Sequence, residues 1–146
     1  MRMLIALWSI VCLPVKTLHV TSSFGYRIHP VTGIYAFHNG VDLRANHDTV
    51  YAIVDGCVST AGYEPVIGLN IHIEHGTVSS IYGHLSQMFV MPRDSVFAGQ
   101  PIGITGATGN VTGEHLHFAI RCGSHYIDPI QFLYGLLIKK EHEQEF

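Results

Sequence analysis

His115-Leu116-His117-Phe118-Ala119-Ile120 is a short run in which polar and apolar side chains alternate before it ends in apolar residues. Residues i and i+2 of an extended strand point to the same face, so His115 and His117 share one face. Leu116 and Phe118 then face the opposite side and belong to a core. The run predicts a β-strand with one buried face and one face that carries imidazoles.

The rest of the chain is typical of short strands joined by turns. Residues 50–54, 69–74 and 78–82 are alternating or β-branched runs, and the spacing of the fifteen glycines fits an all-β domain. Asp55-Gly56 and His75-Gly76 lie between strand runs, where glycine relieves the cost of a positive φ in a tight turn. The sequence therefore predicts an all-β fold of mainly antiparallel sheets.

One short C-terminal helix is also expected. Asp128 would be its N-cap and Pro129 its first residue, followed by residues 130–137. Four apolar side chains would pack on the sheet: Ile130, Leu133, Leu136 and Leu137. We expect the domain to span residues 14–138 and residues 139–146 to form a charged, frayed tail.

The two ends of the pentapeptide His38-Asn39-Gly40-Val41-Asp42 carry metal-ligand side chains. In a straight strand they would lie about 13 Å apart, and the three residues between them are poor helix formers. We therefore expect the chain to curl at Gly40 and to turn both side chains toward one point. Zinc in hydrolytic sites takes three protein ligands and keeps a fourth position for water. His38, Asp42 and one histidine of the pair His115/His117 would fill this pattern.

Several sequence blocks, in the same order along the chain, resemble the LytM/lysostaphin-type zinc peptidases of family M23. They are residues 23–30 (SFGYRIHP), 38–42 (HNGVD), 82–86 (YGHLS), 99–103 (GQPIG), 106–109 (GATG) and 112–118 (TGEHLHF). The resemblance covers most of the chain and implies a small antiparallel β-sandwich or barrel-like fold with the metal at the floor of a groove. It implies one zinc ion held by His38, Asp42 and His117, with His84 and His115 as catalytic histidines.

The activity that this resemblance implies is cleavage of cross-links or stem peptides in bacterial peptidoglycan. His115 would be the general base, while His84 would orient the water or stabilise the oxyanion; the sequence leaves the order of these two roles open. Arg27 and Tyr35 lie near the first ligand and are candidates for contacting substrate. Glycyl bridges and direct cross-links through a diamino acid are both compatible with the sequence, which carries no signal for an oligomeric state.

Two other classes of function are alternatives to a peptidase. A relative that has lost its ligands would act as a regulator that binds other wall hydrolases, but all five motif positions are filled here. A metal-buffering protein would instead use the remaining histidines in several weak sites. We expect these histidines to be surface or hydrogen-bonded residues: His19, His29, His47, His72, His75, His125 and His142.

Composition limits the partners and the compartment. The chain has 146 residues, 13% charged residues and a net charge of −3, which fits one domain and argues against nucleic acid as a partner. Arg2 and the apolar residues 3–13 resemble a secretory signal, too short to span a membrane. We therefore expect export to the periplasm or cell envelope, with a strand packed on the domain as the alternative for this segment.

The three cysteines have no metal-ligand spacing, and their odd number excludes complete internal pairing. We expect Cys57 and Cys122 to be small buried hydrophobic residues. A disulfide bond between them stays open at this point.

Overall fold

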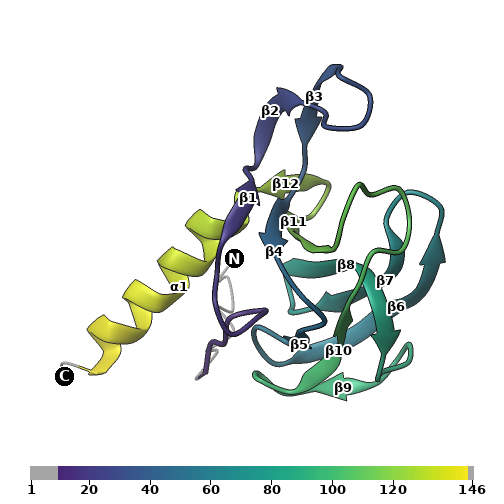
Figure 1. The fold of residues 1–146 in the computed structure, drawn as a ribbon. Helices are drawn as coiled ribbons and strands as arrows, with labels where there is room; N and C mark the ends of the chain where they lie inside the picture. Colours follow the sequence, from purple (N-terminus) through teal and green to yellow (C-terminus); the bar gives the residue numbers. More distant parts are fainter. Residues whose placement is uncertain (1–9, 145–146) are drawn as a thin grey trace.

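The computed structural model describes residues 10–144, which form strands and one C-terminal helix (Figure 1). A ten-stranded sheet has the order β1-β4-β11-β8-β7-β6-β9, with β10 pairing with β5 and β8 and β12 pairing with β11, while β2 and β3 form a separate hairpin. All pairings are antiparallel, which confirms the predicted fold class. The elements are β1 (Val20–Ser22), β2 (Gly25–Ile28), β3 (Tyr35–His38), β4 (Val41–Arg44), β5 (Thr49–Tyr51), β6 (Gly56–Glu64), β7 (Gly68–Glu74), β8 (Val78–Met88), β9 (Ser95–Val96), β10 (Pro101–Thr105), β11 (His115–Cys122), β12 (His125–Ile127) and α1 (Pro129–Gln144).

Strand β11 has the two faces that its sequence predicts. Leu116, Phe118 and Ile120 are fully buried in the core. His115 and His117 are on the other face and are only partly buried. Because β11 lies between β4 and β8, side chains from three adjacent strands meet on this open face.

The strand predicted for residues 50–54 is shorter than expected. Residues 50–54 were predicted to be extended, but β5 ends at Tyr51 although Ala52 and Ile53 are fully buried. The backbone N–H of Ala52 donates to Gln100 O at 3.0 Å, and that of Ile53 donates to the Tyr82 hydroxyl at 3.2 Å. At this point, acceptors in a loop and on a side chain replace the backbone hydrogen bonds of a strand ladder. The periodicity of apolar residues in the sequence does not reveal this replacement.

The two predicted turn glycines act differently. Gly76 has the expected positive φ of 92°. Gly56 does not, so the prediction of a positive φ there is wrong. A Cβ at Gly56 would lie 2.5 Å from the carbonyl oxygen of Glu74 and 2.7 Å from a methyl carbon of Ile73. Glycine is required at this position because β6 and β7 approach each other closely.

The C-terminal helix begins as predicted and ends later. The Asp128 carboxylate accepts hydrogen bonds from the N–H groups of Ile130 at 3.0 Å and Gln131 at 3.4 Å, which is the N-cap arrangement. Leu133 is buried, and Ile130 packs against the core, but Leu137 is 38% exposed. The helix continues to Gln144, so the prediction of a frayed tail is wrong for residues 139–144; their lysine, glutamate and glutamine residues favour helix.

The N-terminal apolar segment is partly described. Residues 1–9 of the predicted signal lie outside the described part of the chain. Val11 joins the core, and the N–H of Cys12 donates to Ile53 O at 2.8 Å, so the described end of this segment packs on the domain. Within residues 10–144 the structure has no helix long and apolar enough to cross a membrane.

The cysteines are free thiols, and no disulfide joins Cys57 to Cys122. Both of these side chains are exposed, so the prediction of buried cysteines is wrong. Alternation along β6 explains Cys57, because Val58 takes the inward position and turns its neighbour outward. Cys122 is the last residue of β11.

Candidate metal centre

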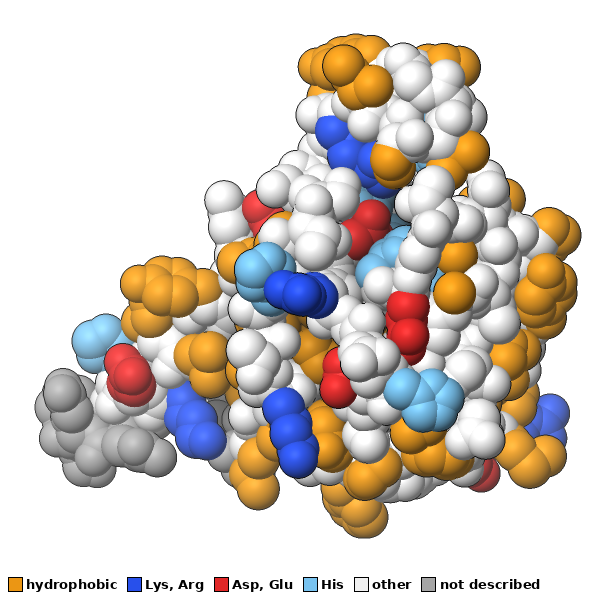
Figure 2. Space-filling model, in the orientation of Figure 1, with side chains coloured by type: hydrophobic (Ala, Val, Ile, Leu, Met, Phe, Trp, Pro, Cys, Tyr) orange, Lys and Arg blue, Asp and Glu red, His pale blue; other side chains and the backbone are white. Residues whose placement is uncertain are grey.

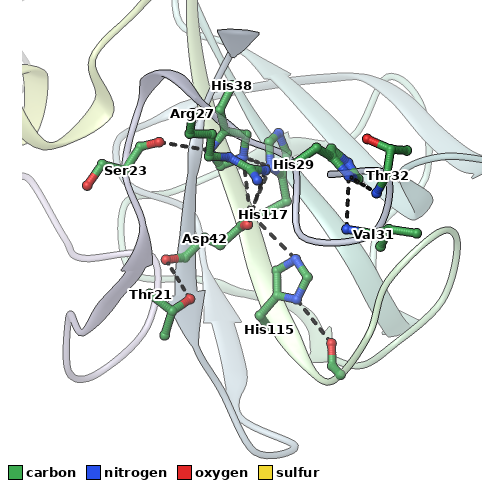
Figure 3. A network of polar contacts seen from close by, with 11 residues as sticks. Thr21, Ser23, Arg27, His29, Val31, Thr32, His38, Asp42, His115 and His117 are labelled. Carbon is green, nitrogen blue, oxygen red and sulfur yellow. Dashed lines mark hydrogen bonds and ion pairs between the residues drawn. The ribbon is translucent and has the colours of Figure 1, made fainter. Parts of the chain in front are cut away.

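Three side chains converge on the open face of the sheet, as Figure 3 shows. Asp42 on β4 and His117 on β11 are direct cross-strand partners, which places their side chains next to each other. His38 is the last residue of β3 and reaches the same point across a two-residue bend at positions 39–40. The predicted curl of the chain is therefore present.

Gly40 makes this bend possible. A Cβ at this position would lie 2.6 Å from the carbonyl oxygen of Phe118 and 2.9 Å from Cε1 of His117. Such distances are far below van der Waals contact, so a larger residue would push β4 away from β11. The glycine between the two ligand positions thus allows both of them to reach His117.

The three candidate ligand atoms form a nearly equilateral triangle. His38 Nε2 lies 3.3 Å from Asp42 Oδ1 and 3.3 Å from His117 Nδ1, and His117 Nδ1 lies 3.2 Å from Asp42 Oδ1. A tetrahedral zinc ion with bonds of about 2.0–2.1 Å needs ligand atoms about 3.3–3.4 Å apart. The donor set of two imidazoles and one carboxylate also suits zinc. Among residues 10–144 this is the one group with the proximity that a metal ion requires.

The protonation states at this triangle favour metal binding. Burial alone would raise the pKa of Asp42, but hydrogen bonds with His117 and His38 outweigh it and hold that pKa well below its usual range. Burial lowers the pKa of His117, although the Asp42 carboxylate opposes this effect. Metal ligands must be deprotonated, and an ionised carboxylate beside a neutral imidazole meets this condition.

Two further histidines border the triangle. The rings of His84 and His115 lie 4.7 Å apart, and His115 Nε2 is 3.5 Å from Asp42 Oδ1. His84 Nδ1 is hydrogen-bonded to the carbonyl of Thr108 at 2.8 Å, and His115 Nδ1 to that of Gly113 at 3.0 Å. A carbonyl only accepts, so each Nδ1 carries a hydrogen, and in the neutral form of either ring the free lone pair is on Nε2. Burial lowers the pKa of His84 to about 4, so this ring is neutral near pH 7.

A β-bulge directs His84 into the site. Ile71 pairs with Tyr82 and Leu69 pairs with Leu85, so β8 has one residue more than β7 between these pairs. The extra residue falls at Gly83-His84, and His84 has a positive φ of 59°. Bulges re-aim side chains, and the bulge here leaves His84 among the residues that line the groove.

The carbonyl groups that orient the histidines were not identified from the sequence. The backbone carbonyl of Ser23 accepts a hydrogen bond from His38 Nδ1 at 3.0 Å, and that of Thr108 accepts one from His84 Nδ1. Because these bonds use the backbone, the side-chain types of Ser23 and Thr108 gave no chemical signal. The motif blocks that contain them were the only indication. Loop packing positions Thr108: a Cβ at Gly68 would lie 2.4 Å from its carbonyl oxygen.

A groove of about 390 Å³ runs past the metal centre. Figure 2 shows it as a hollow below the β2–β3 hairpin, with acidic and histidine side chains at its floor. Of the two candidate substrate contacts, Arg27 lines the groove. Tyr35 does not; it is 69% exposed and stacks on Tyr26 on the outer face of the hairpin.

The remaining histidines stay apart from the triangle, as expected. His29 and His72 line the groove, but they belong to no group of metal ligands in the described chain. His75 is 3% exposed and hydrogen-bonded to Ser80 Oγ at 2.7 Å. Within residues 10–144 the triangle is the one group of three or more side chains that could hold a metal ion.

Comparisons with known proteins give a family match for most of the chain. Residues 36–129 match the family model described as Peptidase family M23. The DD-carboxypeptidase/endopeptidase Mpg of Neisseria meningitidis is 34% identical over 119 residues, which are 80% of this chain and 27% of that relative. The chain thus spans about a quarter of the length of the curated relatives it matches.

Solved structures give the same result at the level of the fold. A zinc-containing peptidase from Vibrio cholerae superposes with a TM-score of 0.74 at 37% identity, covering 79% of this chain and 37% of that one. The catalytic domain of lysostaphin from Staphylococcus simulans superposes with a TM-score of 0.73 at 33% identity. The match to lysostaphin covers 80% of this chain and 92% of that domain.

Proposed function

The chain belongs to peptidase family M23, and from this premise we propose that it is a zinc-dependent endopeptidase that hydrolyses peptide cross-links of bacterial peptidoglycan. The observation that carries the proposal is the ligand triangle His38–Asp42–His117 at the floor of an open groove, with His84 and His115 beside it. Relatives named peptidoglycan DD-endopeptidases, such as ShyA of Vibrio cholerae at 43% identity over 96 residues, support the choice of substrate.

The proposed ligands are His38, Asp42 and His117, and their spacing fits a zinc ion. Zinc there would supply Lewis acidity, which polarises the scissile carbonyl and makes water acidic enough to ionise near neutral pH. One carboxylate among three protein ligands would leave the centre with a net positive charge that favours an anionic transition state.

The two flanking imidazoles would move and orient protons. His115 Nε2 has a free lone pair next to Asp42 and accepts the proton of the attacking water as general base. The same imidazolium then gives that proton to the departing amine nitrogen when the C–N bond breaks. His84 Nε2 is also an acceptor, because its Nδ1 hydrogen is bonded to Thr108. We therefore assign His84 to orienting the water rather than to donating a hydrogen bond to the oxyanion.

The substrate places the proposed activity outside the cytoplasm, in the periplasm or cell envelope. This agrees with the expectation from the N-terminal segment, of which residues 1–9 lie outside the described part of the chain. Cell fractionation followed by detection of the mature N-terminus by mass spectrometry tests the location.

Digestion of purified peptidoglycan tests the activity. The zinc-loaded protein is expected to release new amino and carboxyl ends, identified by mass spectrometry, and a chelator is expected to abolish the release. A folded, zinc-loaded sample that cuts neither peptidoglycan nor cross-bridge peptides between about pH 6 and 9 would contradict the enzyme proposal. Binding without cleavage would support the alternative of a regulatory module.

A further inference from the structure

Arg27 lies in the groove and has no part in the proton transfers described above. We propose, on the basis of the proposed function, that Arg27 is a specificity-determining residue that binds a free carboxylate on the substrate residue whose amine departs. This contact would favour direct cross-links through a diamino diacid over glycyl bridges.

The β2–β3 hairpin directs Arg27 toward the metal centre. Alternation along β2 leaves Tyr26 and Ile28 about 70% exposed on the outer face, whereas the Arg27 side chain is 21% exposed. Its Nη2 lies 3.9 Å from Oδ2 of Asp42, the carboxylate oxygen outside the ligand triangle. Figure 3 shows the guanidinium beside Asp42 and the two ligand histidines.

The guanidinium still has hydrogen-bonding capacity. The contact with Asp42 is an ion pair beyond hydrogen-bonding distance. The Nε–H of Arg27 is buried and has no hydrogen-bond partner in the described chain. Buried polar groups are normally hydrogen-bonded, and a guanidinium has five donors in a fork that fits a carboxylate. A guanidinium with an unsatisfied donor, in the lining of a groove, is suited to an anionic ligand.

Arg27 is also the only lysine or arginine among the described residues that line the groove. The other groove-lining residues with a permanent charge are Asp42 and Glu64, which are acidic. A substrate carboxylate entering this groove therefore has one cationic side chain available to it, next to the metal centre.

The chemistry of the two cross-link types decides which one supplies a carboxylate. In a direct cross-link through a diamino diacid, the scissile nitrogen is attached to a carbon that carries a free carboxylate. That carboxylate carbon is three bonds of about 1.3–1.5 Å from the scissile carbonyl carbon. With the carbonyl at the ligand triangle, the carboxylate comes within reach of the adjacent Arg27. In a glycyl bridge the corresponding carbon carries only another neutral peptide group.

A pair of matched substrates tests this assignment. One is a D-alanyl cross-link to diaminopimelic acid with the free carboxylate, and the other is the same peptide with that carboxylate amidated. The wild-type protein should prefer the free acid by about 10–10²-fold in kcat/KM, the range for a hydrogen-bonded charge. In Arg27→Gln the ratio should fall toward one because only the acid becomes a worse substrate, and Arg27→Lys should keep part of the preference.

Controls separate this role from a structural one. Arg44→Gln removes a positive charge from the same strand as Asp42, outside the groove lining, and should leave the ratio unchanged. If Arg27 only orients Asp42, Arg27→Gln should lower cleavage of both substrates equally and reduce zinc content. That result, or an unchanged ratio in Arg27→Gln, would overturn the assignment.

A binding measurement keeps the two proposals distinguishable. If the wild-type protein cleaves neither substrate, the proposed function fails, and the role of Arg27 is read from binding. The probes are N-acetyl-D-alanine and N-acetyl-D-alaninamide, titrated into the zinc-loaded protein by NMR. Tighter binding of the acid that is lost in Arg27→Gln would support a carboxylate site, and equal binding of both probes would overturn it.

Discussion

Two groups of histidine-containing polar residues show how the same residue type serves different purposes in one sheet. The sealed network consists of His75, Ser80 and Tyr82, which are between 0% and 3% exposed. The open cluster consists of the three proposed ligands together with His84 and His115, on the groove face. Strand β8 contributes to both groups, through Ser80 and Tyr82 on one side and His84 on the other.

The difference between the groups is in the use of the ring nitrogens. In the sealed network, His75 Nδ1 bonds to Asp55 O at 2.8 Å and Nε2 bonds to Ser80 Oγ at 2.7 Å, and Ser80 bonds to the Tyr82 hydroxyl at 3.0 Å. In the open cluster, Nδ1 of His84 and Nδ1 of His115 are each hydrogen-bonded to a backbone carbonyl. The Nε2 atom of each ring is then available to bind or move a proton. A histidine with both nitrogens satisfied stabilises the fold, whereas one with a free lone pair beside a groove can bind or move a proton.

Loss of a ligand should have the largest effect. His38→Ala, Asp42→Ala or His117→Ala each removes one of three protein ligands, so metal and turnover should both be lost. Metal analysis and a peptidoglycan-release assay measure the two effects. His75→Ala is the matched control, because it removes an imidazole from the sealed network and should keep one zinc per chain. Full zinc occupancy in all three ligand variants would show that the ligands are wrongly assigned.

Loss of a flanking imidazole should reduce catalysis but not metal binding. His115→Ala and His84→Ala should keep zinc and lose about 10²–10⁴-fold in kcat, the range for general acid–base groups. Turnover per folded molecule should be unchanged in His75→Ala. A variant at position 84 or 115 that loses its zinc would instead identify that histidine as a ligand, and wild-type kcat would remove it from the mechanism.

The free energy of unfolding should depend more on the sealed network than on the open cluster, the reverse of the order expected for catalysis. His75→Ala removes the hydrogen bonds that the ring makes with the Asp55 carbonyl and the buried Ser80 hydroxyl, and Ser80 keeps its contact with Tyr82, so the free energy of unfolding should fall by about 1–3 kcal/mol. His115→Ala, at a partly exposed position, should change it by about 0.5 kcal/mol or less. Urea denaturation of the metal-free proteins measures both values. Equal losses in the two variants would remove the distinction between the sealed network and the open cluster.

The smallest expected effect is a pH dependence of stability. Burial lowers the pKa of His75 below its ordinary value of 6.5, so the unfolded chain binds the proton more readily than the folded one. The contribution of the neutral His75 ring to the free energy of unfolding is therefore complete above about pH 6.5. It is lost as pH falls through and below that value. Urea midpoints of metal-free protein at about pH 7.5 and 5.5 should differ less in His75→Gln than in the wild type. An identical decline in both proteins would exclude His75 as a contributor.

The parts of the fold that follow from local periodicity could be predicted from the sequence. The alternation of β11 placed Leu116 and Phe118 in the core and both histidines on the open face. The ordered motif blocks led to the five residues of the open cluster, which the structure brings together, while their individual roles stay predictions. The curl at Gly40 followed from excluding a straight strand and a helix.

The features that depend on distant partners could not be predicted. The position of His84 depends on a bulge in the pairing of β8 with β7, and a one-residue change of register leaves no periodic signal in either strand. Gly56 is needed because of its distance from Glu74 O rather than its own φ. The inward direction of Arg27 and the outward direction of Tyr35 became distinguishable only when β2 and β3 were paired.

Anomalous scattering at the zinc absorption edge, measured on crystals of the zinc-loaded protein, locates the bound metal directly. We expect one zinc peak per chain within bonding distance, about 2.0–2.2 Å, of His38 Nε2, Asp42 Oδ1 and His117 Nδ1. His84, His115 and His75 should all lie outside that distance. A zinc ion bonded to any of these three histidines, or the absence of a peak at the triangle, would show that the metal centre is wrongly assigned.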